Sequence, residues 1–165
     1  MLYRGALYRV LNPNYAREPL SGRGAELYGG RFNPNGVAAL YSSLSVVTAL
    51  REANQVGSLQ PTTLVAYDAH IEDIFDSRDE DALKAEGMNP AVLSDTTWRE
   101  QMNVSGEAMT QTFARRLMAN GFNALLVKSF APGATDNDLN LVLWRWSDRA
   151  PSRLTLIDDE NRLSR

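Results

Sequence analysis

Apolar residues recur along the chain in short runs of strand length, and their pattern predicts five or six β-strands. Residues 62–71 alternate between apolar and polar side chains, as a strand with one buried face does. The apolar positions of this alternation are Val65, Tyr67, Ala69 and Ile71. Continuous apolar runs predict further strands, which we place at residues 6–11, 37–41, 123–130, 140–146 and 153–157.

A helix with one apolar face is predicted soon after the strand at residues 37–41. Ser45 is a suitable N-cap for this helix. Its apolar face consists of Val46, Ala49, Leu50 and Ala53. At roughly 100° per residue, Glu52 falls at the border of this face, beside Ala49. We therefore expect the Glu52 carboxylate to be partly desolvated.

A second amphipathic helix is predicted in the C-terminal half of the chain. Ser105 is its expected N-cap, and the pair Asn120-Gly121 is its expected end. Its core-facing stripe consists of Met109, Phe113 and Leu117. Shorter helical segments are expected before Gly87 and from Asn89, whereas residues 98–104 are expected to be irregular.

The order of these elements favours an α+β fold. Five or six strands and about three helices do not alternate cleanly, which argues against a wound parallel sheet. The chain has 165 residues, 44% of them hydrophobic and 22% charged, and these values suit a single domain over residues 1–165. Residues 12–25 and 131–139 are interpreted as loops, and the acidic stretch 72–81 as a solvated surface.

Composition excludes several classes of site. The chain has no cysteine, so disulfides and thiolate chemistry are excluded, and its single histidine, His70, excludes multi-histidine metal sites. We expect no metal site, and we interpret His70 as a strand-end residue. The net charge of −3 does not favour direct nucleic-acid binding. No run reaches the roughly 18 apolar residues of a membrane span, and no signal peptide is recognisable, so a cytoplasmic protein is expected.

The stretch from Gly29 to Ala53 carries the strongest indication of a binding site. A loop rich in Gly, Asn and Pro surrounds Arg31, the next strand ends in Tyr41, and the following helix carries Glu52. A cation, an aromatic ring and a carboxylate on successive elements are able to hold a charged, partly aromatic ligand. Structural roles are the alternative: a turn arginine, a core tyrosine and a glutamate paired with Arg51.

Four residues outside this stretch are further candidates. Arg9 either pairs with a carboxylate inside its strand or faces the ligand. Tyr28 is either a second aromatic residue of the site or an anchor of the loop. Ser129 lies at a strand end beside a flexible loop, a common place for site residues, and Asn140 begins the next strand.

The motif G-x-R-F-N-x-x-G, followed by a strand ending in Tyr and a helix carrying Glu, resembles the signature of RES-domain proteins. These are the toxins of the Res–Xre toxin–antitoxin systems. The residues that carry the resemblance are Gly29, Arg31, Phe32, Asn33, Gly36, Tyr41 and Glu52, with Leu7–Val10, Ser129 and Asn140–Leu143 in corresponding places. Phe32 stands where Trp is more usual, and the aromatic character is retained.

The resemblance implies an ADP-ribosyltransferase-like fold with a split β-sheet that holds NAD in a cleft, where the nicotinamide–ribose bond is broken. Glu52 would then stabilise the positive charge that develops at the ribose, as carboxylates do in glycoside hydrolysis. Arg31, helped by Arg9, would bind the pyrophosphate. Tyr41 would stack on the nicotinamide ring while Ser129 orients it. Tyr28 and Asn140 are additional candidates for NAD contacts.

Three functions follow as alternatives. The chain is expected to deplete NAD as a glycohydrolase or phosphorylase, or to transfer ADP-ribose to a protein. A non-enzymatic module that binds a nucleotide or an antitoxin is the third. The resemblance also implies an Xre-like helix-turn-helix antitoxin as partner, and this antitoxin would make the contacts with DNA. It further implies that the free toxin arrests growth.

Overall fold

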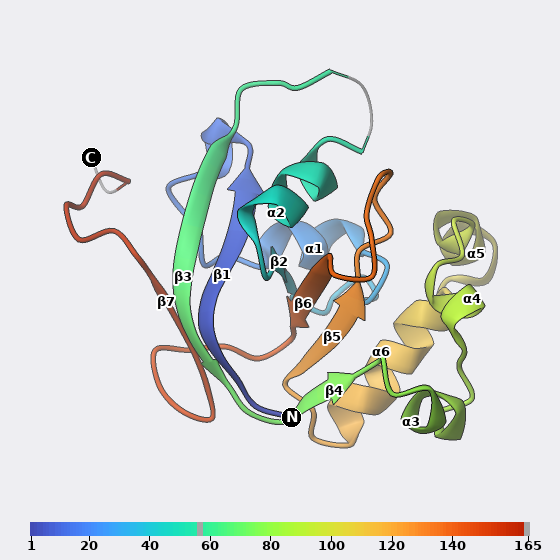
Figure 1. Cartoon of the computed structure of the whole chain (residues 1–165). Helices are drawn as coiled ribbons and strands as arrows, with labels where there is room; N and C mark the ends of the chain where they lie inside the picture. Colours follow the sequence, from blue (N-terminus) through green and yellow to red (C-terminus); the bar gives the residue numbers. More distant parts are fainter. Residues whose placement is uncertain (56–57, 164–165) are drawn as a thin grey trace.

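The computed structural model describes residues 1–55 and 58–163, and over these residues the strands form one curled, seven-stranded sheet (Figure 1). The strands are β1 (Tyr3–Leu11), β2 (Leu40–Ser43), β3 (Thr63–Ile71), β4 (Ile74–Asp76), β5 (Ala124–Lys128), β6 (Leu139–Leu143) and β7 (Ser152–Leu156). Their spatial order is β4-β5-β6-β2-β1-β3-β7. Only the β4–β5 pair among these described strands is parallel. The mixed sheet with its helices confirms the predicted α+β class.

The sheet has a narrow junction between β1 and β2. These two strands share a single register pair, Tyr8 with Ser43, whereas β1 and β3 are paired from Tyr3 with Ile71 to Leu11 with Thr63. Hydrogen bonds of the ladder therefore hold the β1–β3–β7 half together and the β4–β5–β6–β2 half together, with little pairing between the halves.

At β5 and β6, both faces of the sheet are buried. Because side chains alternate across a strand, Leu125 and Val127 of β5 pack on the side that carries Phe113 and Leu117. Leu126 points to the other side, into a core built mainly from β1, β3 and β6. A strand buried on both faces has no polar alternation, which is why it reads as a continuous apolar run in the sequence.

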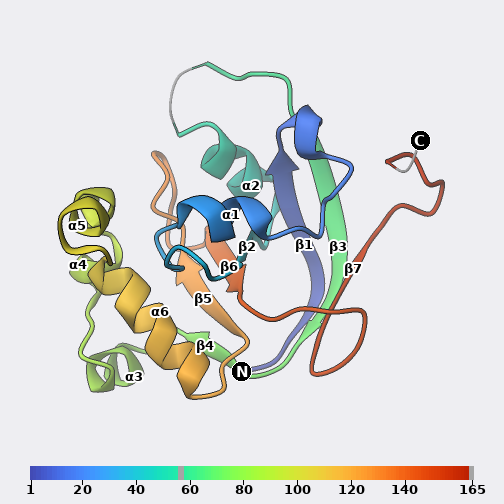
Figure 2. The same cartoon turned by 180° about the vertical axis from the view of Figure 1, so that it is seen from behind.

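The helices are distributed over both sides of the sheet. They are the 3-10 turn η1 (Pro13–Tyr15) and helices α1 (Arg23–Tyr28), α2 (Val46–Ala53), α3 (Glu80–Ala85), α4 (Pro90–Leu93), α5 (Trp98–Ser105) and α6 (Met109–Ala119). Helix α2 lies in front of the sheet in Figure 1 and α1 in front in Figure 2, so the two cover opposite sides. Helices α3–α6 are grouped next to β4 and β5. None of the described helices combines the length and hydropathy that crossing a bilayer requires.

Three predictions about the helical region are wrong. Residues 98–104, expected to be irregular, belong to α5, and Ser105 is the last residue of that helix. Gly106 adopts the left-handed conformation that ends it, with φ of 83°, and its N–H donates to the Met102 carbonyl. Helix α6 therefore starts only at Met109, which is 54% exposed and not part of the core.

Three further segments differ from the prediction. Part of the acidic stretch 72–81 forms the edge strand β4, whose Ile74 and Phe75 are buried against β5. The expected loop 12–25 contains η1 and the start of α1. Strand β2 begins at Leu40 rather than at residue 37. A three-residue strand and short helices are too brief for periodicity to reveal.

Candidate active site

A cleft of about 400 Å³ opens where β1, β2, β5, β6, α2 and α5 meet. It lies at the narrow junction between β1 and β2, which contribute Tyr8 and Ser43 to its wall. Five of the predicted site residues line it, namely Arg9, Arg31, Tyr41, Glu52 and Asn140. Ser129 is not among the lining residues but lies directly behind Glu52, and Tyr28 lies outside the cleft.

Glu52 is presented to the cleft by α2. Ser45 caps this helix as predicted, accepting a hydrogen bond of 3.1 Å from the Thr48 N–H. The helix then turns Ala49, Glu52 and Ala53 toward the cleft. The predicted apolar face is thus only partly a core face, because Ala49 is buried while Ala53 is exposed beside the cleft.

The two oxygens of the Glu52 carboxylate have different surroundings. Oε1 accepts a hydrogen bond of 2.6 Å from Asn140 Nδ2 and a second from the Ser129 hydroxyl. Oε2 accepts a single hydrogen bond, of 2.5 Å, from Nε2 of the exposed Gln55. Oε1 is therefore fixed by Asn140 of β6 and by Ser129, the residue that follows β5, and Oε2 is the oxygen that a ligand reaches by displacing one exposed amide.

The donors to Glu52 are themselves held in place. Ser43 lies opposite Asn140 in the β2–β6 ladder, and its hydroxyl donates to Asn140 Oδ1 at 2.7 Å. This bond orients the amide so that Nδ2 faces Glu52. The Ser129 hydroxyl accepts from the Ala131 N–H, so its own proton is directed to Glu52.

Asp138 links α2 to the loop between β5 and β6. Its buried carboxylate accepts hydrogen bonds from the Thr135 N–H at 2.8 Å and the Thr48 hydroxyl at 2.7 Å, and from Arg51 through both oxygens at 2.9 Å. The Thr135 N–H, the Thr48 hydroxyl and the Arg51 charge lower the pKa of Asp138 to about 2. The Asp138 carbonyl also accepts from the Ser129 N–H. Arg51 therefore pairs with Asp138 and not with Glu52.

Asp138 is a site residue that the sequence does not reveal. It lies in a polar loop with Asp136 nearby, and Asp136 is exposed and pairs with Lys128 at 3.1 Å. The only local signal is Thr135 three residues before Asp138, a spacing at which side chain and backbone can bond. That signal does not indicate that the Asp138 carboxylate is buried against α2.

Arg31 is anchored to the segment between α4 and α5. Its Nη1 donates to the carbonyls of Leu93 at 3.1 Å and Asp95 at 2.7 Å. The guanidinium also lies over the Phe130 ring, 5.1 Å from the centroid. Burial lowers the pKa of Arg31, and the Glu52 charge acts in the opposite direction. Among the described residues the other guanidinium nitrogens have no hydrogen-bond partner, so they are available to a ligand of the cleft.

The Tyr41 hydroxyl is used within the protein. It donates to Asn33 Oδ1 at 2.6 Å and accepts from the Phe32 N–H at 3.1 Å, and burial raises the pKa of this hydroxyl. A Cβ at Gly30 would lie 2.4 Å from the same oxygen, so the close approach requires glycine at this position. Tyr41 therefore ties the Arg31 loop to β2, and its ring is what it offers to the cleft.

Arg9 and Tyr28, for which two roles were left open, have different positions. Arg9 donates to the carbonyls of Pro19 at 3.3 Å and Ser21 at 3.2 Å, which holds the segment after η1 against β1. Arg9 thus combines a structural role with a place in the cleft wall. Tyr28 is the last residue of α1 and is 76% exposed.

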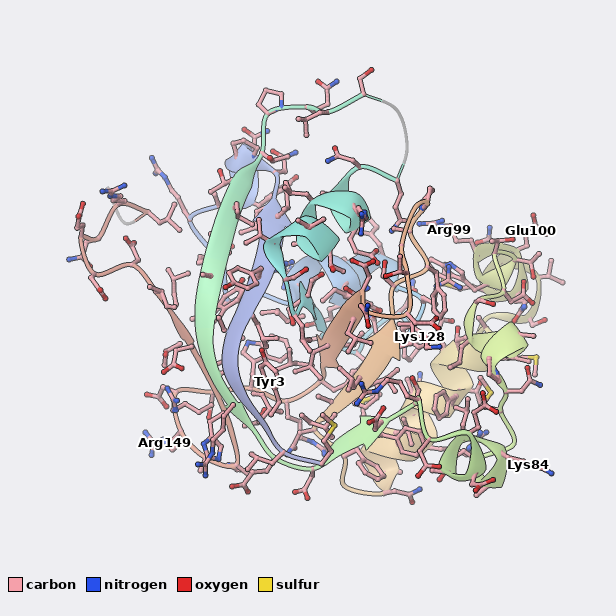
Figure 3. All side chains as sticks on the ribbon, in the orientation of Figure 1. Tyr3, Lys84, Arg99, Glu100, Lys128 and Arg149 are labelled. Carbon is pink, nitrogen blue, oxygen red and sulfur yellow. The ribbon has the colours of Figure 1, made fainter. Side chains whose placement is uncertain are left out.

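Several cleft residues are not indicated by the sequence, four of them charged or aromatic residues near Arg31 and Glu52. Trp98 and Arg99 begin α5, the segment expected to be irregular, and Lys128 and Phe130 flank Ser129. In Figure 3, Arg99 and Lys128 lie in the region between α5 and β5, whereas Glu100 lies on the outer side of α5. Within the described part of the chain, no group of three or more His, Cys, Asp or Glu side chains is arranged to hold a metal ion.

The family model of the RES domain matches residues 6–165, which include each of the cleft residues named above. No protein with a curated description matches the chain.

Proposed function

Because the chain belongs to the RES domain family, the toxins of Res–Xre toxin–antitoxin systems, we propose that it breaks the bond between nicotinamide and ribose in NAD. The family has NAD-related activity in general. The observation that carries the proposal is the Glu52 carboxylate, the single acidic group among the described residues of the cleft wall, with one oxygen fixed and the other available to a ligand.

The chemistry of NAD cleavage suits this carboxylate. When the bond between ribose C1′ and the nicotinamide nitrogen breaks, its electron pair leaves with nicotinamide, and positive charge develops at the ribose. A carboxylate held nearby stabilises that charge and accepts hydrogen bonds from ribose hydroxyls. Glu52 Oε2 supplies this function in our proposal, and a nucleophile then forms the new bond to C1′.

The remaining residues have separate roles in the proposal. Arg31 binds the diphosphate, and the Tyr41 ring packs on the nicotinamide. Ser129 and Asn140 act as positioning residues, because both donate to Glu52 Oε1. Arg9 contributes positive charge to the wall, and Tyr28 has no assigned contact with NAD. A cleft of about 400 Å³ falls in the size range of small-molecule sites.

The acceptor of the ADP-ribose group defines the kind of enzyme. Water gives a glycohydrolase, phosphate a phosphorylase, and a protein nucleophile an ADP-ribosyltransferase. All three use the same bond cleavage, so the proposal covers them together. We place the reaction in the cytoplasm, together with an Xre-like helix-turn-helix antitoxin as partner.

The test is to incubate the purified chain with NAD labelled on its adenylate side, with and without phosphate and cell extract. Nicotinamide release and label on protein are followed together. Glu52→Gln is compared with Glu100→Gln, which makes the same change on the outer side of α5. We expect Glu52→Gln to lower kcat by about 100-fold or more, the loss typical of an electrostatic group at the reacting centre. Circular dichroism of both variants controls for folding.

Each arm of this experiment has a distinct meaning. Nicotinamide release without extract identifies a glycohydrolase, and a requirement for phosphate identifies a phosphorylase. Label on a protein band identifies a transferase. Neither release nor label in any arm contradicts the proposal and favours a non-enzymatic module that binds a nucleotide or an antitoxin.

A further inference from the structure

The cleft carries the opposite charge to the whole chain. The net charge of the protein is −3, yet the described residues of the cleft wall include four cations, Arg9, Arg31, Arg99 and Lys128, and one carboxylate, Glu52. A concave wall with an excess of one sign attracts ligands of the opposite sign. The cleft is therefore suited to an anion.

Three of the four cations already have partners. Arg9 donates to two main-chain carbonyls, Arg31 donates to two others, and Lys128 pairs with Asp136. Among the residues that the structure describes, none forms a hydrogen bond or an ion pair with the Arg99 side chain. Its guanidinium lies 4.4 Å from the centroid of the Trp98 ring instead. All its N–H donors are therefore free for a ligand.

Trp98 makes Arg99 a more ordered donor than an ordinary exposed arginine. Trp98 is buried, with 8% of the residue exposed, so its ring is a fixed surface on which the guanidinium rests. Holding a long side chain on such a surface reduces the entropy that binding would otherwise remove. A free arginine stacked on a buried ring is thus preorganised for an anion.

Arg31 and Arg99 lie on the same side of the cleft and share a contact with Trp98. Both guanidinium groups lie against the Trp98 ring, that of Arg31 at 6.0 Å from the centroid, and both line the cleft. The positive charge of Arg99 is one of the influences that lower the pKa of Arg31. Like charges at such a site repel each other until an anion lies near both.

We propose that Arg99 and Arg31 form a two-arginine clamp for the diphosphate of a dinucleotide, and that Arg99 determines specificity for substrates with phosphate groups. This inference rests on the proposed function, to which it adds a specificity residue. Arginine suits the role because its planar fork bonds phosphate oxygens in pairs. The limited volume of the cleft favours a small nucleotide over a polymer.

The experiment compares Arg99→Gln with the wild-type chain and with Arg4→Gln, which removes the same charge from an exposed position at the far end of β1. Binding of ADP and of adenosine is measured by calorimetry, and NAD cleavage by steady-state kinetics. We expect Arg99→Gln to weaken ADP binding and raise the KM for NAD by about tenfold, the effect of one charge-assisted hydrogen bond at a partly exposed site. Adenosine binding and kcat should not change.

The outcomes separate this inference from the proposed function. Equal ADP affinity and equal KM in Arg99→Gln and wild type overturn the clamp. An equal loss of ADP and adenosine binding also overturns it, because a fold defect would act on both ligands. ADP binding that depends on Arg99, in a wild-type chain that leaves NAD intact, supports the clamp and rejects the NAD-cleaving function. A wild-type chain that neither binds ADP nor cleaves NAD rejects both.

Discussion

At the scale of single residues, the site divides into groups that face the ligand and groups that hold them. Ser129 and Asn140 donate to one oxygen of Glu52, and Ser43 orients Asn140. Arg31 is held through two carbonyls while its other nitrogens remain available. Hydrogen bonds of this kind fix a reactive group without occupying the side it presents to the substrate.

At Tyr41, mutation can separate the hydroxyl, which holds the Arg31 loop, from the ring, which faces the cleft. Tyr41→Phe keeps the ring but leaves Asn33 Oδ1 and the Phe32 N–H without their partner. We expect it to lower the free energy of unfolding by about 1–3 kcal/mol and to keep most of the activity. Tyr41→Ala also removes the ring and should lose NAD cleavage. Denaturant unfolding and NAD kinetics check both variants. Full stability of Tyr41→Phe together with lost activity would instead assign the hydroxyl to the chemistry.

At the scale of elements, the position of Glu52 depends on how α2 is joined to the strands. Thr48 and Arg51 lie before Glu52 on α2, and both bond Asp138, whose carbonyl accepts from Ser129. The helix and the β5–β6 loop therefore share one buried carboxylate. Displacing either would move Glu52 relative to the donors on Oε1.

Asp138 should make the stability of this junction sensitive to acid. Its pKa is lowered from 3.8 to about 2 in the folded chain, so its stabilising effect is complete above pH 3.8 and is lost as the pH falls toward 2. Asp138→Asn removes this titration. We expect the wild-type chain to lose stability more steeply than Asp138→Asn between pH 4 and pH 2, as measured by urea unfolding at each pH. Parallel curves over this window would contradict the role of Asp138.

Asp138→Asn should also affect catalysis, although residue 138 does not contact the substrate in our proposal. We expect Asp138→Asn to lower kcat by roughly tenfold while the KM for NAD changes little, because Glu52 loses its fixed position. Asp136→Asn is the matched control, since Asp136 lies in the same loop but is exposed and pairs with Lys128. Equal effects of the two variants on kcat would argue against positioning through Asp138.

At the scale of the whole molecule, the cleft lies where the two halves of the sheet meet. The β1–β3–β7 half supplies Arg9, the other half supplies Tyr41 and Asn140, and α5 closes the third side with Trp98 and Arg99. A site built from separate parts of the fold assembles only when the whole chain has folded.

The toxin role predicts a phenotype of cells that produce this chain. We expect strong expression of the wild-type chain to arrest growth, because the proposed NAD cleavage would remove a metabolite that every cell needs. Glu52→Gln at the same protein level should permit growth, and co-expression of the proposed Xre-like antitoxin should relieve the arrest by the wild type. Growth curves with immunoblots check these outcomes. Normal growth at a high level of wild-type protein would refute the toxin role.

The sequence by itself determines the local structure and the family. The alternation in β3, the Ser45 cap and the order of Arg31, Tyr41 and Glu52 all follow from residues a few positions apart, because helix and strand periods are local. The β4 edge strand was not predicted because it has only three residues, and α5 was not predicted because Trp98 is its one buried residue, which leaves no apolar stripe to recognise.

Only the tertiary structure decided which distant residues form hydrogen bonds and contacts with one another in the site. Ser129 and Asn140 lie 77 and 88 positions from Glu52 in the sequence. Arg51 and Asp138 are likewise far apart in sequence, and so are Arg31 and Arg99, which both contact the Trp98 ring. Sheet order and helix docking bring these groups together. No local pattern encodes them, because a hydrogen bond between distant residues depends on every element that positions its two ends.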